Sequence, residues 1–315
     1  MRSRQSQEKE RGRDRPSVDP ELLKEVRRIQ LRTDKLVTDV VSGGYSSVFR
    51  GSGIEFEEVR EWAEGDDIRS VDWNVTARQG RPFIKKFVEE RELTLLFVLD
   101  VSRSMDFASQ SIDGRPRSLR RLAVEFLACL GLSAGRNNDK VGLVTFGEEV
   151  DLFVPPKKGR AHLLRLLRES FVRVESDRGT GLGQALAYAS RVQRKKSILF
   201  VLSDFLSEWP EKEVRLAARR HDLILVPTVD PRLMELPPQG LFRLRDVETG
   251  EEQVLDASSA RVREAYAEQM RAFYEERQAG ARKFGADWLP LDTRESVTSN
   301  VVAFFRQREA RSAKR

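Results

Sequence analysis

The chain alternates short apolar runs with longer stretches in which apolar residues recur at helical spacing. Residues 93–99 read Leu-Thr-Leu-Leu-Phe-Val-Leu, a nearly continuous apolar run that is typical of a strand buried on both faces of a sheet. Similar runs occur at 141–146, 198–202 and 223–229. Because helical stretches lie between most of these runs, the pattern predicts a doubly wound, mostly parallel α/β sheet.

The other elements follow from the same periodicity and from turn residues. A run with two prolines at 150–156 predicts a short strand at the edge of the sheet, since proline cannot donate to a strand ladder. Residues 231–256 interrupt the alternation, and 241–255 within them predict a hairpin that turns at 248–250. A last strand is expected at 286–291. The predicted helices cover residues 118–135, 162–169, 182–194, 210–220, 258–280 and 295–306.

The N-terminal part of the chain has a different character. Its first residues are polar, rich in arginine and without periodicity, which predicts a disordered basic tail. A helix is expected from Pro20, and extended runs at 54–62 and 81–91 predict a small β-rich subdomain with Trp62 and Trp73 in its core. The chain therefore divides into four predicted parts: a disordered basic tail (1–19), an N-terminal helix with the β subdomain (20–91), the α/β domain with its hairpin insertion (92–308) and a second basic tail (309–315).

Composition narrows the class of protein. The chain has 315 residues, of which 39% are hydrophobic, so a sizeable core can form. No apolar run approaches the roughly 20 residues that span a bilayer, and the N-terminus has no apolar segment of a secretory signal. The single cysteine, Cys129, excludes an internal disulfide framework and a cysteine metal cluster, and its place on an apolar helix face predicts a packing role. We therefore expect a soluble, cytoplasmic protein.

The formal net charge of +6 is concentrated at the two ends. Residues 1–15 carry a net +3 and residues 306–315 a net +4, so the chain between them is close to neutral. Solvated, flexible ends account for this distribution, and nucleic acid is not an expected partner. The tails allow at most a weak contact with an anionic membrane surface.

Candidate ligands follow directly after the first buried strand. The strand ends at Asp100, and Ser102 and Ser104 follow at alternate positions. Residues two apart in an extended turn point the same way, so one carboxylate and two hydroxyls should converge where open α/β sheets bind ligands. Such oxygen ligands suit Mg²⁺ or Mn²⁺. The local alternative is that Asp100 caps a turn while the serines bond nearby backbone.

The segment Asp100-Val-Ser102-Arg-Ser104 resembles the Asp-x-Ser-x-Ser signature of von Willebrand factor A domains, which hold a metal-ion-dependent adhesion site. The resemblance implies two further site residues downstream, a loop threonine and then a loop aspartate. Thr180 and Asp204 occur in that order, the first before a predicted helix and the second after a predicted strand. The implied Mg²⁺ (or Mn²⁺) site thus consists of Asp100, Ser102, Ser104 and Thr180, with Asp204 acting mainly through water.

The segment before the α/β domain resembles a second family. Glu-Phe-x-x-x-Arg-x-Trp at 55–62, Gly-Asp-Asp-x-Arg-x-x-Asp-Trp at 65–73, Thr-Ala-Arg at 76–78 and Glu-Glu-Arg-Glu at 89–92 are similar to the bacterial and archaeal proteins called domain of unknown function 58. In that family such a segment precedes a von Willebrand factor A-like domain, and members are associated with MoxR-type AAA+ ATPases. The resemblance covers roughly residues 40–230.

Enzymatic alternatives find less support. Asp66 and Asp67 could form a catalytic carboxylate pair, but a turn in which one of them caps backbone, while Arg69 or Arg78 pairs with Asp72, is the favoured interpretation. The chain has two histidines, predicted on surface helices or at their ends, and no Gly-x-Ser-x-Gly motif, so a hydrolase triad is not expected. A phosphotransferase with an aspartyl nucleophile would need a second aspartate where Ser102 stands.

The glycines around Thr180 resemble a phosphate-binding turn only superficially. No Gly-x-x-x-x-Gly-Lys-Ser/Thr motif occurs, so these glycines are expected to bring Thr180 close to the ion. We therefore expect a protein that is not an enzyme and has no small-molecule substrate. It would bind a Glu or Asp of a protein partner, either a MoxR-type AAA+ ATPase or its client, through the metal, and would act as an adaptor or co-factor for such an ATPase. A scaffold with a degenerate metal site and a weak Mg²⁺-dependent phosphohydrolase using Asp100 remain the alternatives.

Overall fold

The computed structural model describes eight ranges of the chain: 55–63, 66–67, 71–88, 92–112, 114–172, 180–238, 240–245 and 251–312. The predicted N-terminal tail and the helix expected from Pro20 lie outside these ranges. None of the helices in them combines the length and the hydrophobicity that a bilayer crossing requires.

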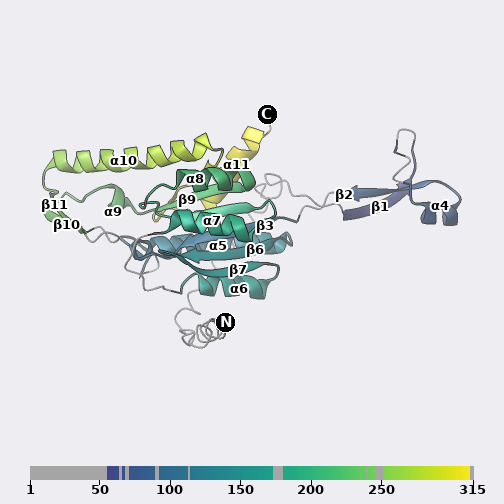
Figure 1. The fold of residues 1–315 in the computed structure, drawn as a ribbon, viewed down its shortest axis with the longest axis horizontal. Coiled ribbons are helices and arrows are strands. Elements are labelled where there is room, and N and C mark those ends of the chain that lie inside the picture. Colours follow the sequence, from purple (N-terminus) through teal and green to yellow (C-terminus); the bar gives the residue numbers. More distant parts are fainter. Residues whose placement is uncertain are drawn as a thin grey trace, which may run out of the picture.

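The main body is an α/β fold built on a seven-stranded, mostly parallel sheet (Figure 1). The strand order is β12-β9-β8-β3-β6-β7, and β13 also pairs with β9. Only the edge strand β7 is antiparallel, which confirms the doubly wound sheet and the edge position of the proline-containing strand. The strands are β3 (Thr94–Asp100), β6 (Lys140–Phe146), β7 (Val150–Lys157), β8 (Ile198–Ser203), β9 (Asp222–Val229), β12 (Asp287–Trp288) and β13 (Leu291–Asp292).

The first strand of the sheet, β3, lies in its middle. The chain moves outward from β3 to β6 and β7 on one side, then returns to β8 on the other side and continues to β9 and β12. The strand order therefore reverses between β3 and β8. In open α/β sheets, the crevice outside the carboxyl ends of the strands at such a reversal is where ligands bind.

Six helices cover the two faces of the sheet. Leu95, Phe97 and Leu99 of β3 pack in one core with α5, α6 and α11, while Leu96 and Val98 pack in a second core with α7 and α8. The unbroken apolar run of β3 is explained by this burial on both sides. The covering helices are α5 (Leu119–Arg136), α6 (Arg160–Glu169), α7 (Leu182–Val192), α8 (Glu211–Arg220), α10 (Ala260–Lys283) and α11 (Val297–Ser312).

Two C-terminal elements differ from the sequence prediction. The last strand is split into β12 and β13 around Leu289 and Pro290, because proline has no N–H to donate to the ladder. The final helix, α11, continues to Ser312, so residues 309–312, which were assigned to a basic tail, are helical. Its apolar side chains, including Val301 and Phe305, are buried against the α5 core.

The predicted insertion is present as a short helix and a hairpin. α9 (Pro231–Met234) follows β9, and β10 (Leu241–Arg245) pairs antiparallel with β11 (Glu252–Asp256). A smaller pair of strands, β4 (Ser111–Ile112) and β5 (Arg115–Pro116), lies in the polar connection before α5. The turn at 248–250 lies outside the described residues.

The N-terminal unit is a small antiparallel pair of strands with one short helix. β1 (Glu55–Glu61) pairs with β2 (Phe83–Val88), as the extended runs predicted, and Figure 1 shows this unit apart from the main body. The helix α4 (Trp73–Gln79) was not predicted; Asp72 caps its start by accepting from two backbone N–H groups, and Gly80 ends it at a φ of 69°. The prediction that Trp73 belongs to a core is wrong, because the helix start leaves it 69% exposed.

The carboxylate pair of this unit has a local role. Asp66 accepts from the Ala63 N–H at 2.8 Å and pairs with Arg60 at 2.7 Å, which agrees with a turn and not with a free catalytic carboxylate. The Arg60 contact lowers the pKa of Asp66. Of the two predicted partners of Asp72, Arg69 lies outside the described residues, and pairing with Arg78 stays a prediction. The capping role of Asp72 was missed.

His221 lies at the end of α8, as predicted, but it is buried and not on the surface. It follows α8, is 3% exposed, and neither ring nitrogen has a hydrogen-bond partner among the described residues. Burial, with a smaller contribution from the charge of Arg220, lowers the pKa of His221 from 6.5 to about 4. The imidazole is therefore neutral in the folded protein at neutral pH.

This burial makes stability depend on pH. Between pH 6.5 and 4 the unfolded chain binds a proton at His221 and the folded chain does not, so the free energy of unfolding falls as the pH is lowered. Between pH 7 and pH 5, the free energy of unfolding should fall by roughly 1–2 kcal/mol less in His221→Gln than in the wild type. Urea unfolding at the two pH values measures this difference. His162→Gln serves as the control at the other histidine. An equal loss in wild type and His221→Gln would contradict the assignment.

Candidate metal centre

Asp100 is the last residue of β3 and is completely buried. Its Oδ1 accepts from the backbone N–H of Ser102 at 2.9 Å, and its Oδ2 accepts from the hydroxyl of Ser203 at 2.6 Å. The predicted local role, in which Asp100 caps a turn, is therefore part of the structure. Each carboxylate oxygen still has a lone pair beyond these single bonds, so the cap does not exhaust its capacity as a ligand.

Ser102 and Ser104 point to the same side, as predicted, although Ser104 lies in a 3₁₀ turn and not in the extended turn that the prediction assumed. Their hydroxyl oxygens are 3.1 Å apart, on the short 3₁₀ turn η2 (Arg103–Asp106) and the residue before it. The buried guanidinium of Arg120 holds this turn by donating to the carbonyl of Val101 at 2.8 Å and by pairing with Asp106 at 3.2 Å. Both serines are half-buried.

Asp204 follows the carboxyl end of β8, the strand next to β3, and is 3% exposed. Its Oδ1 accepts from the N–H of Leu206 at 3.1 Å, while its Oδ2 has no hydrogen-bond partner among the described residues. Burial raises the pKa of Asp204, and the nearby Ser104 hydroxyl opposes this rise. A buried carboxylate oxygen without a donor is costly unless a cation or a proton compensates it.

The two aspartates also act on each other. Burial is the main cause that raises the pKa of Asp100, and the negative charge of Asp204 raises it further, while the bonds from Ser102 and Ser203 lower it. Two carboxylates of like charge thus lie close together in a region of low dielectric constant. A divalent cation between them would reverse this repulsion into attraction.

The loop of Thr180 reaches the same edge of the sheet. The N–H of Gly181 donates to the carbonyl of Gly147 at 2.7 Å, directly after Phe146, which pairs with Asp100 across β3 and β6. A Cβ at position 181 would lie 2.0 Å from the carbonyl oxygen of Glu148, so glycine is required for this close approach. Glycine is thus needed for the approach of this loop to residues 147–148, while the expected closeness of Thr180 to an ion, and ligation by its side chain, stay predictions.

The other two glycines near Thr180 are Gly179 and Gly183. Gly183 lies where α7 starts, and a Cβ there would be 3.1 Å from Pro210, so it permits close packing of α7 against α8. Gly179 lies outside the described residues.

Several residues that shape this centre were missed in the sequence. Ser203 stands directly before Asp204 and could have been found as a hydroxyl at the end of a strand. Tyr274 of α10 donates to the carbonyl of Asp204 at 3.0 Å, and the buried Arg277 donates to the carbonyl of Phe205 at 2.9 Å. Both lie about seventy residues further along the chain, and no local pattern connects them with the site.

The donor set fits a hard cation. Asp100, Ser102, Ser104 and Asp204 offer only oxygen atoms, which Mg²⁺ and Mn²⁺ prefer. No group of three or more His, Cys, Asp or Glu side chains that could hold an ion occurs within the described part of the chain. A site here must therefore combine two carboxylates with neutral hydroxyls.

Comparison with known proteins identifies related chains. A family model described as "Protein of unknown function DUF58" matches residues 58–276, more than half of the chain. The "Uncharacterized protein Rv1480" of Mycobacterium tuberculosis (strain ATCC 25618 / H37Rv) is 29% identical over 294 residues, covering 92% of this chain and 90% of the relative. The "Uncharacterized protein Mb1516" of Mycobacterium bovis matches with the same values.

Solved structures that resemble part of this chain include proteins from bacteria and a VWA (von Willebrand factor A) domain. An aerotolerance-related membrane protein from Bacteroides fragilis is 18% identical with a TM-score of 0.46, over 70% of this chain and 99% of that chain. BatB from Bacteroides thetaiotaomicron has 18% identity and a TM-score of 0.43, over 71% and 100%. The SpRpn10 VWA domain has 13% identity and a TM-score of 0.36, over 67% and 94%. All three TM-scores are below 0.5, so these similarities carry no argument about this chain.

The repulsion between the aspartates predicts the effect of removing one charge. Asp204→Asn keeps an oxygen for the Leu206 N–H but removes a buried negative charge beside Asp100. We expect it to raise the free energy of unfolding of the metal-free protein at pH 7 by roughly 1–2 kcal/mol, measured by urea unfolding with EDTA present. Glu268→Gln, an exposed carboxylate on α10, is the matched control and should change stability by less than about 0.5 kcal/mol. A destabilised Asp204→Asn variant would contradict the repulsion.

Proposed function

The chain belongs to the family described as protein of unknown function DUF58, and from that premise we propose that it is a metal-dependent module for binding another protein. In this proposal Mg²⁺ or Mn²⁺ is held at the carboxyl edge of the sheet, between β3 and β8. The residues that would hold it, directly or through water, are Asp100, Ser102, Ser104 and Thr180, with Asp204 acting mainly through water.

One observation carries the proposal. Asp100 and Asp204 are both buried, both have a raised pKa, and the Oδ2 of Asp204 has no hydrogen-bond partner among the described residues. The two carboxylates lie where the strand order reverses, which is where open α/β sheets bind ligands. A cation bound there would offset their repulsion. The paired hydroxyls of Ser102 and Ser104 supply neutral ligands beside them.

The balance of charge suggests what the site recognises. In this arrangement only one or two carboxylates face the ion, Asp204 acts mainly through water and the hydroxyls add no charge, so the positive charge of the ion is incompletely neutralised. When bound, Mg²⁺ keeps positions open to water, and an acidic side chain of a partner can take one of them. The bonds from Ser203 and from the Ser102 N–H fix the orientation of Asp100, so the site is arranged before the partner arrives.

The partner proposed from the family resemblance is a MoxR-type AAA+ ATPase or its client, with a Glu or Asp at the contact. A catalytic role has less support. His162 bonds the carbonyl of Val141 at the start of β6, and His221 precedes β9, so both histidines lie at the edge of the sheet opposite Asp100. An imidazole that could activate a nucleophile at the proposed site is therefore not provided by either of them.

Metal binding can be tested without a partner. We expect Mg²⁺ or Mn²⁺ at one hundred times its Kd to stabilise the metal-free protein by about 2.7 kcal/mol, because the ion binds only the folded state. Asp100→Ala should abolish this effect, and Ser104→Ala should weaken ion binding, measured by calorimetric titration and thermal unfolding. Ser299→Ala, an exposed serine of α11, is the matched control. No affinity of the wild type for either ion would favour a scaffold with a degenerate site.

Partner binding provides the second test. The immobilised protein should retain a purified MoxR-type ATPase in Mg²⁺ and release it in EDTA. The Asp100→Ala variant should retain none of the ATPase. This variant should unfold at a temperature close to that of the wild type. Retention that is unchanged in EDTA would contradict a contact through the metal. Release of phosphate from a phosphate ester that depends on Asp100 would support the phosphohydrolase alternative.

A further inference from the structure

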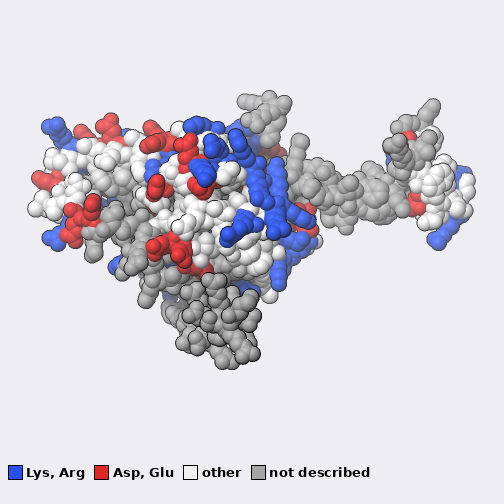
Figure 2. All heavy atoms as spheres, viewed as in Figure 1, with Lys and Arg blue, Asp and Glu red and all other residues white. Residues whose placement is uncertain are grey.

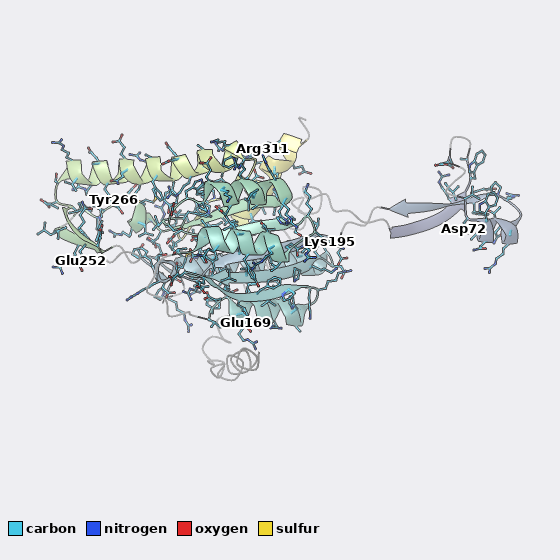
Figure 3. The ribbon with its side chains drawn as sticks, viewed as in Figure 1. Asp72, Glu169, Lys195, Glu252, Tyr266 and Arg311 are labelled. Atoms are coloured by element: carbon cyan, nitrogen blue, oxygen red, sulfur yellow. The ribbon has the colours of Figure 1, made fainter. Side chains whose placement is uncertain are left out.

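A basic face covers the edge of the sheet opposite Asp100. Six exposed cationic side chains form it: Arg191, Arg194, Lys195, Lys196, Arg219 and Arg220. Figure 2 shows Lys and Arg gathered at this end of the main body, and Figure 3 labels Lys195 there. The sequence had assigned the excess positive charge to the two tails, so this concentration within the folded domain was not anticipated.

The direction of two neighbouring helices brings these residues together. α7 and α8 start side by side, since Gly183 lies next to Pro210 and Glu213. They run in the same direction and end at the edge where the parallel strands begin. Their last residues and the α7–β8 loop therefore meet, and Arg220 donates to the carbonyl of Arg194.

The charges of this face are not neutralised within the described part of the chain. None of its six cations forms an ion pair with a described residue; Arg191 stacks on the ring of Tyr188, and Arg220 bonds only a backbone carbonyl. The contrast with α11 is informative, because Arg308 pairs with both Asp222 and Asp287, and Arg311 pairs with Asp287. A concentration of unpaired positive charge indicates an anionic partner.

α8 adds an apolar side chain to this face. Val214 and Ala217 point into the core, so the opposite side of the helix carries Leu216, which is 51% exposed. Lys212 and Arg219 lie one turn before and after Leu216 on the same side, and both are exposed. A leucine flanked by two long cationic side chains can enter the boundary of a lipid layer while the charges remain at the headgroups.

We propose that this basic face binds the surface of a membrane that contains anionic lipids. Clusters of four to eight Lys and Arg residues are the usual recognition element for such surfaces. The exposed leucine fits acyl chains better than a sugar–phosphate backbone. The one amide in the α7–β8 loop, Gln193, bonds Ser197 and the carbonyl of Lys195 and does not face a nucleic acid base.

This contact would orient the molecule. The basic face lies where the parallel strands begin, and Asp100 and Asp204 lie where they end, so membrane binding leaves the candidate metal centre facing the solution. Figure 3 labels Tyr266 and Glu252 at the end of the molecule away from Lys195. The proposal does not depend on whether the centre holds an ion.

The test is sedimentation of the full chain with lipid vesicles, with EDTA present so that the metal centre takes no part. We expect binding to vesicles of phosphatidylcholine with roughly 30% phosphatidylglycerol at about 0.1 M salt, and loss of binding at about 0.5 M salt. The combined change Arg194→Glu, Lys195→Glu and Lys196→Glu should weaken binding roughly tenfold or more. Leu216→Ser should weaken it by a smaller factor without changing the charge.

A matched control changes the same charge elsewhere. Arg261→Glu, Arg271→Glu and Arg282→Glu combined alter three exposed cations of α10 and should leave binding unchanged. All variants must unfold at temperatures close to that of the wild type. The proposal would be overturned if the control variant lost binding equally, or if the Arg194–Lys196 variant bound as the wild type does. It would also be overturned by equal binding to pure phosphatidylcholine, or by unchanged binding of Leu216→Ser. Tighter binding to duplex RNA than to the vesicles would overturn it in favour of nucleic acid.

Discussion

Two buried carboxylates of like charge, Asp100 and Asp204, set the central constraint of this structure. Asp100 ends β3 and Asp204 follows the adjacent parallel strand β8, and the pairing of β3 with β8 holds them together although their charges repel. Backbone N–H groups and the Ser203 hydroxyl offset part of the cost, but the Oδ2 of Asp204 receives no hydrogen bond among the described residues. The sheet thus stabilises an arrangement that the isolated side chains would not adopt.

The position of Asp204 also depends on a distant helix. Phe205 has a φ of 55°, a conformation that costs a bulky residue roughly 1–3 kcal/mol. The ring of Phe205 is buried against Trp288 at 5.5 Å, and Arg277 and Tyr274 of α10 bond the carbonyls of Phe205 and Asp204. Packing and hydrogen bonding therefore hold the strained turn, so α10 and the loop that carries Asp204 form one structural unit.

The parallel sheet gives the molecule two chemically different ends. Hydroxyls and carboxylates collect where the strands stop, because the loops after β3 and β8 and the loop before α7 all lie there. Cationic residues collect where the strands start, because α7 and α8 both end there. Basic residues in the last turn of a helix interact favourably with its dipole, which is one local reason why this end of the fold is positive.

The sequence by itself determined the α/β class, the edge strand, the order of the main strands and helices of the α/β domain, and the loop after β3; the loops of Thr180 and Asp204 were implied by the family resemblance. Those features depend on periodicity, on proline and on residues close in the chain, such as Asp100, Ser102 and Ser104. The tertiary structure alone decided that His221 is buried, that Trp73 is exposed, and that Arg120, Tyr274 and Arg277 support the centre. It also placed the unpaired cations of α7 and α8 on one face. Burial, charge repulsion and hydrogen bonds between residues far apart in the chain arise only when the chain is packed, so no local pattern could reveal them.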